Sequence, residues 1–383
     1  MIKHADSSWE RERVVCVCYS VRSTYCTSLW NVIDILRHNT TLFPRVDIKF
    51  DAAADSALSP ILLHINPHLD LLFTAHHQRL RTISLRRLAD PNPPITLTYK
   101  DVVLLSASST RPTYPGEGLQ YPGVSFLFDE DGTSGLGLSG AEALKSASNV
   151  GSSVREDRYR EVKRVVVSQT SLDGAETDAL DEVSECDTME GSIQNAVLKV
   201  HDGVILYFYP TASRPIHIRI GVTSAQDLTC DLGAPLRVYY KEDERMAIHS
   251  HNRVPDGIED GYFYNYFQLG VDFLISASNH LVQKVVVHTN IPGTPMFQRY
   301  QRCPWEIQGE PEDEEDGNRL EYIFDVISRF LNGPSREQMP SMQLDRTEDE
   351  RLILPSSTTR LVGFDGIVLE VTEAAQVVTV VLF

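Results

Sequence analysis

Cysteine is scarce in this chain, and its six cysteines include no C-x-x-C pair. A secreted domain held together by disulfides needs a dense set of cysteines, and a structural zinc site needs paired ligands at short spacing. Neither pattern is present. We therefore expect reduced thiols in an intracellular protein, without a structural zinc site.

Long hydrophobic runs and positive charge are also lacking. No apolar run approaches the ~20 residues that a membrane-spanning helix needs, and the first 13 residues hold no continuous apolar core of a signal peptide. Lys and Arg total 35 against 53 Asp and Glu, a net charge of −18. Because nucleic-acid phosphate repels such a chain, we expect no nucleic-acid partner, a cytoplasmic location and only peripheral membrane contact.

What the chain does contain is a set of β-strand patterns, clearest between residues 261 and 305. With 42% apolar residues, 15 Tyr and 14 Phe, the chain can bury a large core. Strands are predicted at 262–267, 271–275 and 281–287, because residues of one face alternate with residues of the other. The segment 290–295 (NIPGTP) ends the pattern, since proline lacks the ladder donor.

A helix followed by strands is predicted three times. Ser28 caps the first helix, which buries Leu29, Val32, Ile33 and Leu36. The second helix starts at Thr223 or Ser224 and ends at Gly233, and the third covers 320–331. The remaining strands are predicted at 46–50, 61–65, 69–73, 80–85, 236–240, 360–364, 367–371 and 377–382. Glycines that open strands, such as Gly270 and Gly366, mark the repeat. The predicted fold class is α+β, mostly antiparallel β-sheet, with three related helix-plus-strands units.

The domain organisation follows from shifts in composition. We predict a first α–β unit at 27–130, a largely disordered insertion at 131–195, a second unit at 196–308, an acidic linker at 309–319 and a third unit at 320–383. The insertion is Gly/Ser-rich at 132–158 and acidic at 168–192, so ordering it is costly. A short strand-like segment at 161–167 lies between these two parts.

No motif identifies a catalytic, cofactor or metal site. GLGLSG at 135–140 matches a dinucleotide fingerprint, but the acidic segment 128–134 separates it from the preceding strand, so phosphate binding is not predicted. The pairs His76–His77 and His249–His251 lack a third ligand at suitable spacing. We predict no enzyme, no cofactor and no small-molecule substrate. The alternative from another class is an uncharacterised hydrolase or metal-dependent enzyme, which requires a pocket around His249, His251 or a Ser/Cys pair.

Two groups of residues are candidates for partner contacts. Tyr262, Tyr264 and Tyr266 either pack in the core or form a docking surface for a protein partner. Four arginines form a positive cluster in an acidic chain, either as a solvated face or as a patch for an acidic partner or a lipid headgroup. These arginines are Arg79, Arg81, Arg86 and Arg87.

Several long segments resemble, in the same order, the phagosome assembly factor 1 family. They are SLWNVIDILR (28–37), HLDLLFTAHHQRLRTISL (68–85), YPGVSFLF (121–128), TSAQDLTCDLGAPLRVYYKEDERMAIHS (223–250), the stretch from 262 to 305 and GIVLEVTEAAQVVTVVLF (366–383). The chain departs from the family before residue 28 and in the acidic insertion.

The resemblance implies an α+β protein without known catalytic residues. It implies a non-enzymatic adaptor of autophagy that associates with the phagophore membrane together with a PROPPIN-like β-propeller partner that reads phosphoinositides. Membrane association would be indirect or phosphoinositide-linked. It also implies, as an alternative, a trans-Golgi network factor in Golgi-to-plasma-membrane transport.

Overall fold

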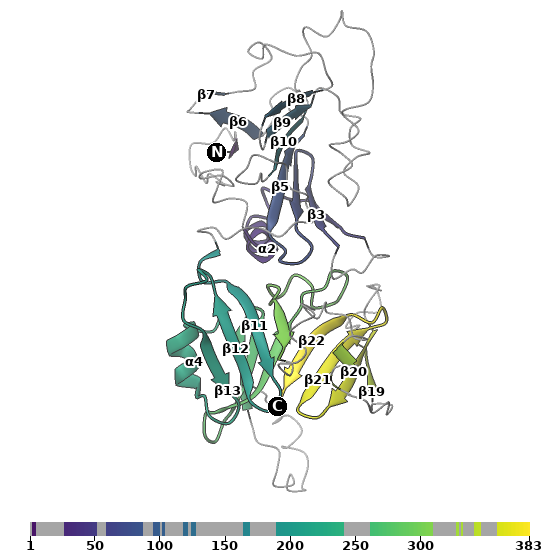
Figure 1. Ribbon diagram of the computed structural model, residues 1–383. Helices are drawn as coiled ribbons and strands as arrows, with labels where there is room; N and C mark the ends of the chain where they lie inside the picture. The colour runs from purple at the N-terminus through teal and green to yellow at the C-terminus, as the bar shows by residue number, and fades with distance from the viewer. Residues whose placement is uncertain are drawn as a thin grey trace, which may run out of the picture. The chain divides into compact units, whose positions relative to one another are not determined.

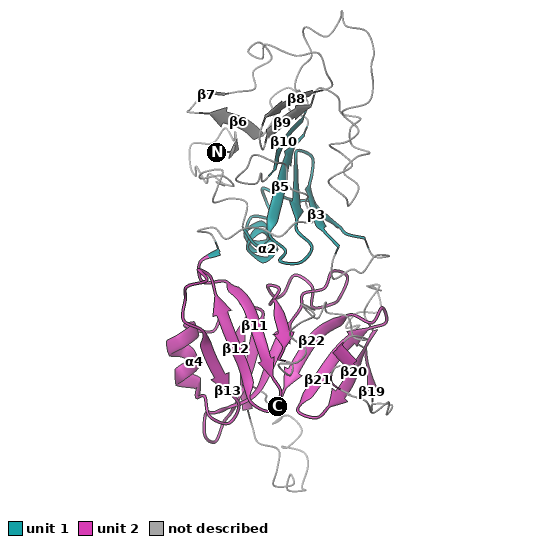
Figure 2. Ribbon diagram, viewed as in Figure 1, with its two compact units in different colours: residues 1–189 teal, residues 190–383 magenta. Residues whose placement is uncertain are grey.

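The computed structural model describes residues 2–4, 27–51, 59–86, 95–99, 102–103, 118–121, 124–127, 164–168, 189–240, 261–308, 327–328, 331, 341–345 and 358–383 (Figure 1). The chain divides into two compact units, Met1–Met189 and Glu190–Phe383 (Figure 2). Both are built mostly from antiparallel sheet, and helices α2 and α4 add the helical part. The predicted α+β class with mostly antiparallel sheet is confirmed.

The first unit contains a seven-stranded sheet in the order β2-β3-β4-β5-β10-β9-β8 and a three-stranded sheet in the order β1-β6-β7. Its elements are β1 (Ile2–His4), α2 (Leu29–His38), β2 (Val46–Lys49), β3 (Ile61–Ile65), β4 (Leu69–Phe73), β5 (Leu80–Leu85), β6 (Ile95–Tyr99), β7 (Val102–Val103), β8 (Gly118–Tyr121), β9 (Val124–Leu127) and β10 (Arg164–Ser168).

The second unit contains an eight-stranded sheet in the order β14-β15-β16-β17-β22-β21-β20-β19 and a four-stranded sheet in the order β13-β12-β11-β18. Its elements are β11 (Ile193–Lys199), β12 (Gly203–Phe208), β13 (Ile216–Arg219), α4 (Ala225–Leu232), β14 (Arg237–Tyr240), β15 (Gly261–Tyr266), β16 (Val271–Ser276), β17 (Val282–His288), β18 (Trp305–Ile307), β19 (Ser341–Asp345), β20 (Thr358–Phe364), β21 (Ile367–Thr372) and β22 (Val377–Leu382).

Both large sheets are assembled in the same order. In the first sheet β2 to β5 form a meander, and in the second β14 to β17 do so. Each large sheet continues with a second set of consecutively paired strands, β8 to β10 in the first sheet and β19 to β22 in the second. The last strands of the two sets pair antiparallel with each other, β5 with β10 and β17 with β22. The predicted units 196–308 and 320–383 therefore contribute to one shared sheet.

The two helices are anchored by the same contacts. Ser28 caps α2 and Ser224 caps α4, as predicted, and Gly233 ends α4 with a positive φ of 80°. In both cases the helix start is bonded to the loop between the third and fourth strands of the meander. The bonds, all 2.9 Å, are Leu29 N to Gln78 O and Leu80 N to Thr27 O for α2, and Ala225 N to His280 O and Val282 N to Thr223 O for α4.

Three hairpins share a further irregularity. The pairing register shifts near the end of β4, β16 and β21, at Leu72/Phe73, Leu274/Ile275 and Glu370/Val371. Each following loop contains one non-glycine residue with positive φ, namely Gln78, His280 and Ala375. Of the predicted third helix, only Ile327, Ser328 and Leu331 are described, and they are helical. The repeat of three complete helix-plus-strands units is therefore not confirmed.

The glycines that precede β16 and β21 allow close approach of other chain segments. Gly270 has φ +74°, and an added Cβ would lie 2.2 Å from Gln301 O. Gly366 has φ +69°, and an added Cβ would lie 2.6 Å from the His201 ring. Glycine is favoured at both positions because an added Cβ would meet these atoms and would be strained at positive φ, most severely at Gly270, where the neighbour is backbone.

Candidate docking surface

Strand β14 is one edge of the eight-stranded sheet, and all four of its side chains are exposed. The exposed fractions are 39% for Val238, 49% for Tyr239 and 64% for Tyr240, and Leu236 just before the strand is 58% exposed. The Arg237 guanidinium lies 5.6 Å from the centroid of the Tyr239 ring. Clustered exposed apolar side chains mark interaction sites, because isolated domains normally bury them.

The predicted docking tyrosines lie on the neighbouring strand β15 and differ in exposure. Tyr240 is opposite Tyr262 and Val238 is opposite Tyr264, so these residues share one face of the sheet. Ring centroids are 5.6 Å apart for Tyr240 and Tyr262, and 5.5 Å apart for Tyr262 and Tyr264. Tyr262 is 9% exposed and Tyr264 is half-buried. Tyr266 lies in the core and donates to Gly233 O at 2.9 Å.

The phenols of Tyr262 and Tyr266 are stabilised in their neutral form. Burial raises the pKa of the Tyr262 phenol, and the neighbouring phenols of Tyr264 and Tyr240 raise it further. Burial also raises the pKa of Tyr266. The Tyr262 hydroxyl is hydrogen-bonded to His280 Nδ1 at 2.9 Å. The row therefore offers neutral aromatic surface with few free polar groups, the composition typical of an interface centre.

The predicted arginine cluster lies largely inside the first unit. Arg79 is 3% exposed and Arg81 is 2% exposed. Arg86 is mostly buried, and its Nε lies 2.8 Å from Asp70 Oδ2. Arg87 lies outside the described residues. The three described arginines are therefore buried or mostly buried in the first unit and do not form a single exposed patch.

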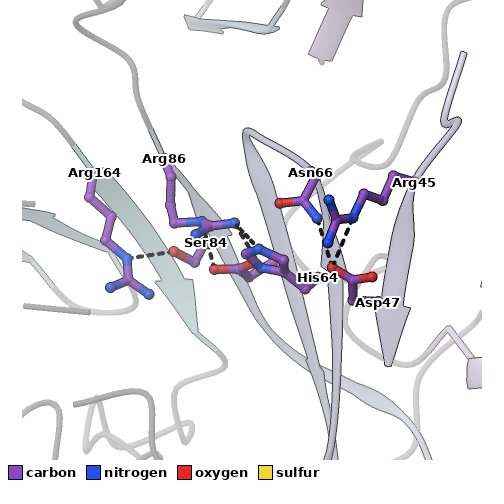
Figure 3. A network of polar contacts seen from close by, with 8 residues as sticks. Arg45, Asp47, His64, Asn66, Ser84, Arg86 and Arg164 are labelled. Carbon is purple, nitrogen blue, oxygen red and sulfur yellow. Dashed lines mark hydrogen bonds and ion pairs between the residues drawn. The ribbon is translucent and has the colours of Figure 1, made fainter. Parts of the chain in front are cut away.

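A polar network crosses one face of the first sheet (Figure 3). His64 Nδ1 lies 2.5 Å from Asp70 Oδ1, and the Arg86 Nη2 group lies 3.1 Å from His64 Nε2. Arg164 Nε donates to Ser84 Oγ at 2.7 Å, and burial lowers the pKa of Arg164. His64 and Arg86 therefore contact one buried carboxylate, and the Arg164–Ser84 hydrogen bond links β10 to β5 on the same face.

A second buried carboxylate occupies the corresponding position in the second unit. Asp272 Oδ2 accepts hydrogen bonds from His288 Nε2 at 3.0 Å and from the Tyr300 hydroxyl at 2.7 Å. The His288 and Tyr300 rings stack with centroids 3.7 Å apart. All three side chains are buried, and burial, followed by the Asp272 charge, raises the pKa of Tyr300. The cluster fastens the segment around Tyr300 to the sheet and is closed to a substrate.

The remaining candidates do not form a reactive centre in the described part of the chain. No group of three His, Cys, Asp or Glu side chains there is arranged to hold a metal ion. Burial raises the pKa of the Cys303 thiol, which keeps it neutral and unreactive. His249, His251 and the GLGLSG segment lie outside the described residues. None of the described helices has the length and apolar character needed to cross a bilayer.

Sequence reasoning missed both carboxylate clusters, although a signal for them exists. Asp70 and Asp272 each occupy the second position of a strand and are followed by three apolar residues. The same interval of 16 residues separates Asp70 from Arg86 and Asp272 from His288. An acidic residue in a buried strand, repeated with a cation at a fixed distance along the chain, predicts a buried ion pair.

Comparison with known proteins places the chain in a family. The model of the family described as phagosome assembly factor 1 matches residues 24–383. A PHAF1 protein of Caenorhabditis elegans is 24% identical over 393 residues, which covers 92% of this chain and 88% of the worm protein. A PHAF1 protein of Drosophila melanogaster is 29% identical over 42% of this chain and 40% of its own length.

A PHAF1 protein of Arabidopsis thaliana is 30% identical over 50% of this chain and 46% of its own length. No solved structure matches the chain significantly. The family model covers well over half of the chain, from before α2 to the end of β22. The protein therefore belongs to the phagosome assembly factor 1 family.

Proposed function

We propose that this protein is a non-enzymatic adaptor in autophagy, which is recruited from the cytoplasm to the phagophore membrane together with a PROPPIN-like β-propeller protein. Membership of a family described as a phagosome assembly factor supports a role in autophagy-related processes and names an assembly role rather than a reaction. The observation that carries the proposal is the exposed apolar row on β14, which continues into Tyr262 and Tyr264. An adaptor needs such a surface, since aromatic anchors supply most of the energy of protein interfaces.

We propose that membrane association is indirect and passes through the propeller partner. Arg79 and Arg81 are buried, and Arg86 lies against Asp70. A headgroup would have to displace Asp70 from Arg86, which leaves a buried carboxylate without its cation. Lipid recognition by the partner avoids that cost.

We also propose that the three hairpins descend from one repeated helix-plus-strands unit. The shared register shift and the shared positive-φ loop residue support this for the strands. The matching anchors of α2 and α4 support it for two of the helices. A repeat of this kind lets one docking face evolve on one copy while the other copies keep the fold.

The adaptor function is tested by affinity purification of the tagged full chain from fed and starved cells, with the recovered proteins identified by mass spectrometry. Tyr240→Ser removes an exposed aromatic anchor and should lower recovery of the β-propeller by about tenfold or more. Val222→Ser is the matched control, because Val222 and Tyr240 are both 64% exposed but Val222 lies in the turn before α4. The control should recover the propeller at the wild-type level.

Three outcomes decide between the functions. Recovery of a β-propeller with autophagy proteins, reduced by Tyr240→Ser alone, supports the adaptor. Recovery of Golgi coat or exocytic proteins in both conditions, without a propeller, would replace it with the trans-Golgi alternative. A turnover of any small-molecule ester or phosphate by the purified chain would favour the enzyme alternative.

A further inference from the structure

The two large sheets begin with edge strands of different chemistry. In the first sheet β2 pairs with β3, and Asp47 lies opposite His64. In the second sheet β14 pairs with β15, and Arg237 lies opposite Asn265, the residue that corresponds to His64. Two positions further on, β2 has the exposed Lys49, whereas β14 has the exposed Tyr239. Lysine on an edge strand prevents pairing with another sheet, because its charge would be buried. β14 lacks this protection.

Other described edges also carry protection. β13 exposes His217 and Arg219, and β19 exposes Ser341, Met342 and Gln343, of which only Met342 is large and apolar. β14 exposes three large apolar side chains within four residues. Such a strand is a template for further sheet pairing, because its outward N–H and C=O groups are flanked by surface that gains from burial.

We propose that β14 pairs antiparallel with β14 of a second copy of this chain, in a two-fold dimer centred on Val238. In this register Val238 faces its own copy, Arg237 faces Tyr239, and Leu236 faces Tyr240. Residues directly opposite in an antiparallel pair share a face, and each of these pairs joins residues of the same face. Three apolar pairs then lie on one face, namely Val238 with its copy and Leu236 with Tyr240 twice, and two arginine–aromatic pairs lie on the other.

The identity of the occupant follows from this self-complementarity. Arg237 already lies over the Tyr239 ring within one chain, so the same contact across the dimer needs no new chemistry. A register centred on Tyr239 would place Tyr239 opposite its own copy and away from Arg237, whereas the register centred on Val238 pairs Arg237 with Tyr239 twice. A two-fold axis makes every contact twice, which is why isologous dimers are the commonest assemblies.

The dimer adds a property that does not depend on the proposed function. A two-fold axis perpendicular to the sheet leaves corresponding faces on the same side. The tyrosine rows of both copies, each formed by Tyr240, Tyr262 and Tyr264, would therefore lie side by side on one surface. Any protein that docks there would meet two sites, and its apparent affinity would gain from the second site without new contacts.

Sedimentation velocity of the purified full chain over a wide range of concentration tests the dimer. The wild type should sediment as two chains at high concentration. Tyr239→Lys places a lysine opposite Arg237 twice and should raise the dissociation constant by about a hundredfold or more. Arg237→Glu combined with Tyr239→Lys should restore the dimer, because opposite charges then face each other. Met342→Lys, which changes a 60%-exposed residue on the far edge strand β19, is the control and should leave the dimer intact.

Tyr239→Glu separates loss of pairing from loss of folding. It removes the same ring as Tyr239→Lys but faces Arg237 with a favourable charge, so it should dimerise. A wild type that stays monomeric at every concentration would overturn the proposal and leave the edge to a different protein. A Tyr239→Lys variant that still dimerises, or a double variant that stays monomeric while folded by circular dichroism, would also overturn it.

Discussion

The two large sheets have a buried aspartate at corresponding positions, and the basic side chain beside it differs. Asp70 in β4 meets Arg86, and Asp272 in β16 meets His288. The positions correspond, because the backbone N–H of Arg86 donates to the residue before β4 and that of His288 to the residue before β16. An arginine stays charged in any environment, whereas a histidine can release its proton. The first sheet therefore depends on its carboxylate more than the second.

The C-terminal hairpin shows what the same position looks like without charge. Val368 corresponds to Asp272, and Phe383 corresponds to His288, since Phe383 N donates to Gly366 O at 3.1 Å. This hairpin folds in the same sheet with an apolar pair. Val368 is half-buried and Phe383 is 45% exposed, so this copy of the hairpin forms at a more open position without a carboxylate.

The largest expected effect comes from removing one partner of these pairs. Asp70→Asn should lower the free energy of unfolding of the first unit by about 3–5 kcal/mol, because the mostly buried Arg86 guanidinium loses its carboxylate partner. Asp272→Asn should cost the second unit about 1–3 kcal/mol, because the hydrogen bonds from His288 and Tyr300 are weakened. Native-state hydrogen exchange of β4–β5 and β16–β17 amides measures the two costs separately.

A double variant sharpens the same comparison. Asp272→Val with His288→Phe copies the pair found in the C-terminal hairpin and should be more stable than Asp272→Val alone by about 1 kcal/mol or more. Equal costs for Asp70→Asn and Asp272→Asn would contradict the distinction between arginine and histidine. A double variant less stable than the single one would show that the two hairpins are not interchangeable.

The next effect concerns the glycines before β16 and β21. Gly270→Ala should cost about 3–5 kcal/mol, because its Cβ would meet the backbone oxygen of Gln301 and also suffer strain at positive φ. Gly366→Ala should cost about 1–2 kcal/mol, because its Cβ meets the His201 side chain, which can move. Urea denaturation of each variant gives the values. His201→Ala in the Gly366→Ala background should recover part of the loss and should recover none in Gly270→Ala.

The hairpin strands were predictable because their signals are local. Strands 61–65, 69–73, 80–85 and 377–382 are confirmed to the residue, and the other hairpin strands lie within two residues of the prediction. Alternating and β-branched residues between short turns determine them. The sheet formed by β11, β12, β13 and β18 was not predicted, since β18 pairs in parallel with β11 from far along the chain, with Ala196 opposite Trp305. No local sequence pattern predicts which distant strand will pair with β11.

The candidate surface was only partly accessible to sequence reasoning. The aromatic residues of β15 stood out by composition, yet their exposure depends on their distance from the sheet edge, and Tyr266 is buried while Tyr240 is exposed. Nothing in the sequence says that β14 ends the sheet. The arginines were grouped because they are neighbours in sequence, but Arg79 and Arg81 are buried in a loop and strand that pack against the core.

The smallest expected effect is the loss of stability when the N-cap serine of either helix is removed. Ser28→Ala and Ser224→Ala should each cost about 1 kcal/mol at neutral pH, since each removes the acceptor for a backbone N–H. In α4, Asp227 also accepts from the Ser224 N–H at 2.9 Å and from the Ser224 hydroxyl at 2.8 Å, and both bonds lower the pKa of Asp227. Ser224→Ala removes the hydroxyl bond, whereas the corresponding residue of α2 is Asn31. A depressed pKa means that the carboxylate stabilises the fold above its ordinary pKa, and that this contribution is lost as the pH falls through the folded value.

The cost of Ser224→Ala, measured by hydrogen exchange of α4 amides, should therefore shrink on acidification. The cost of Ser28→Ala should stay constant over the same range, because no carboxylate takes part in that cap. Identical pH dependence in the two helices would show that Asp227 adds nothing to the α4 cap.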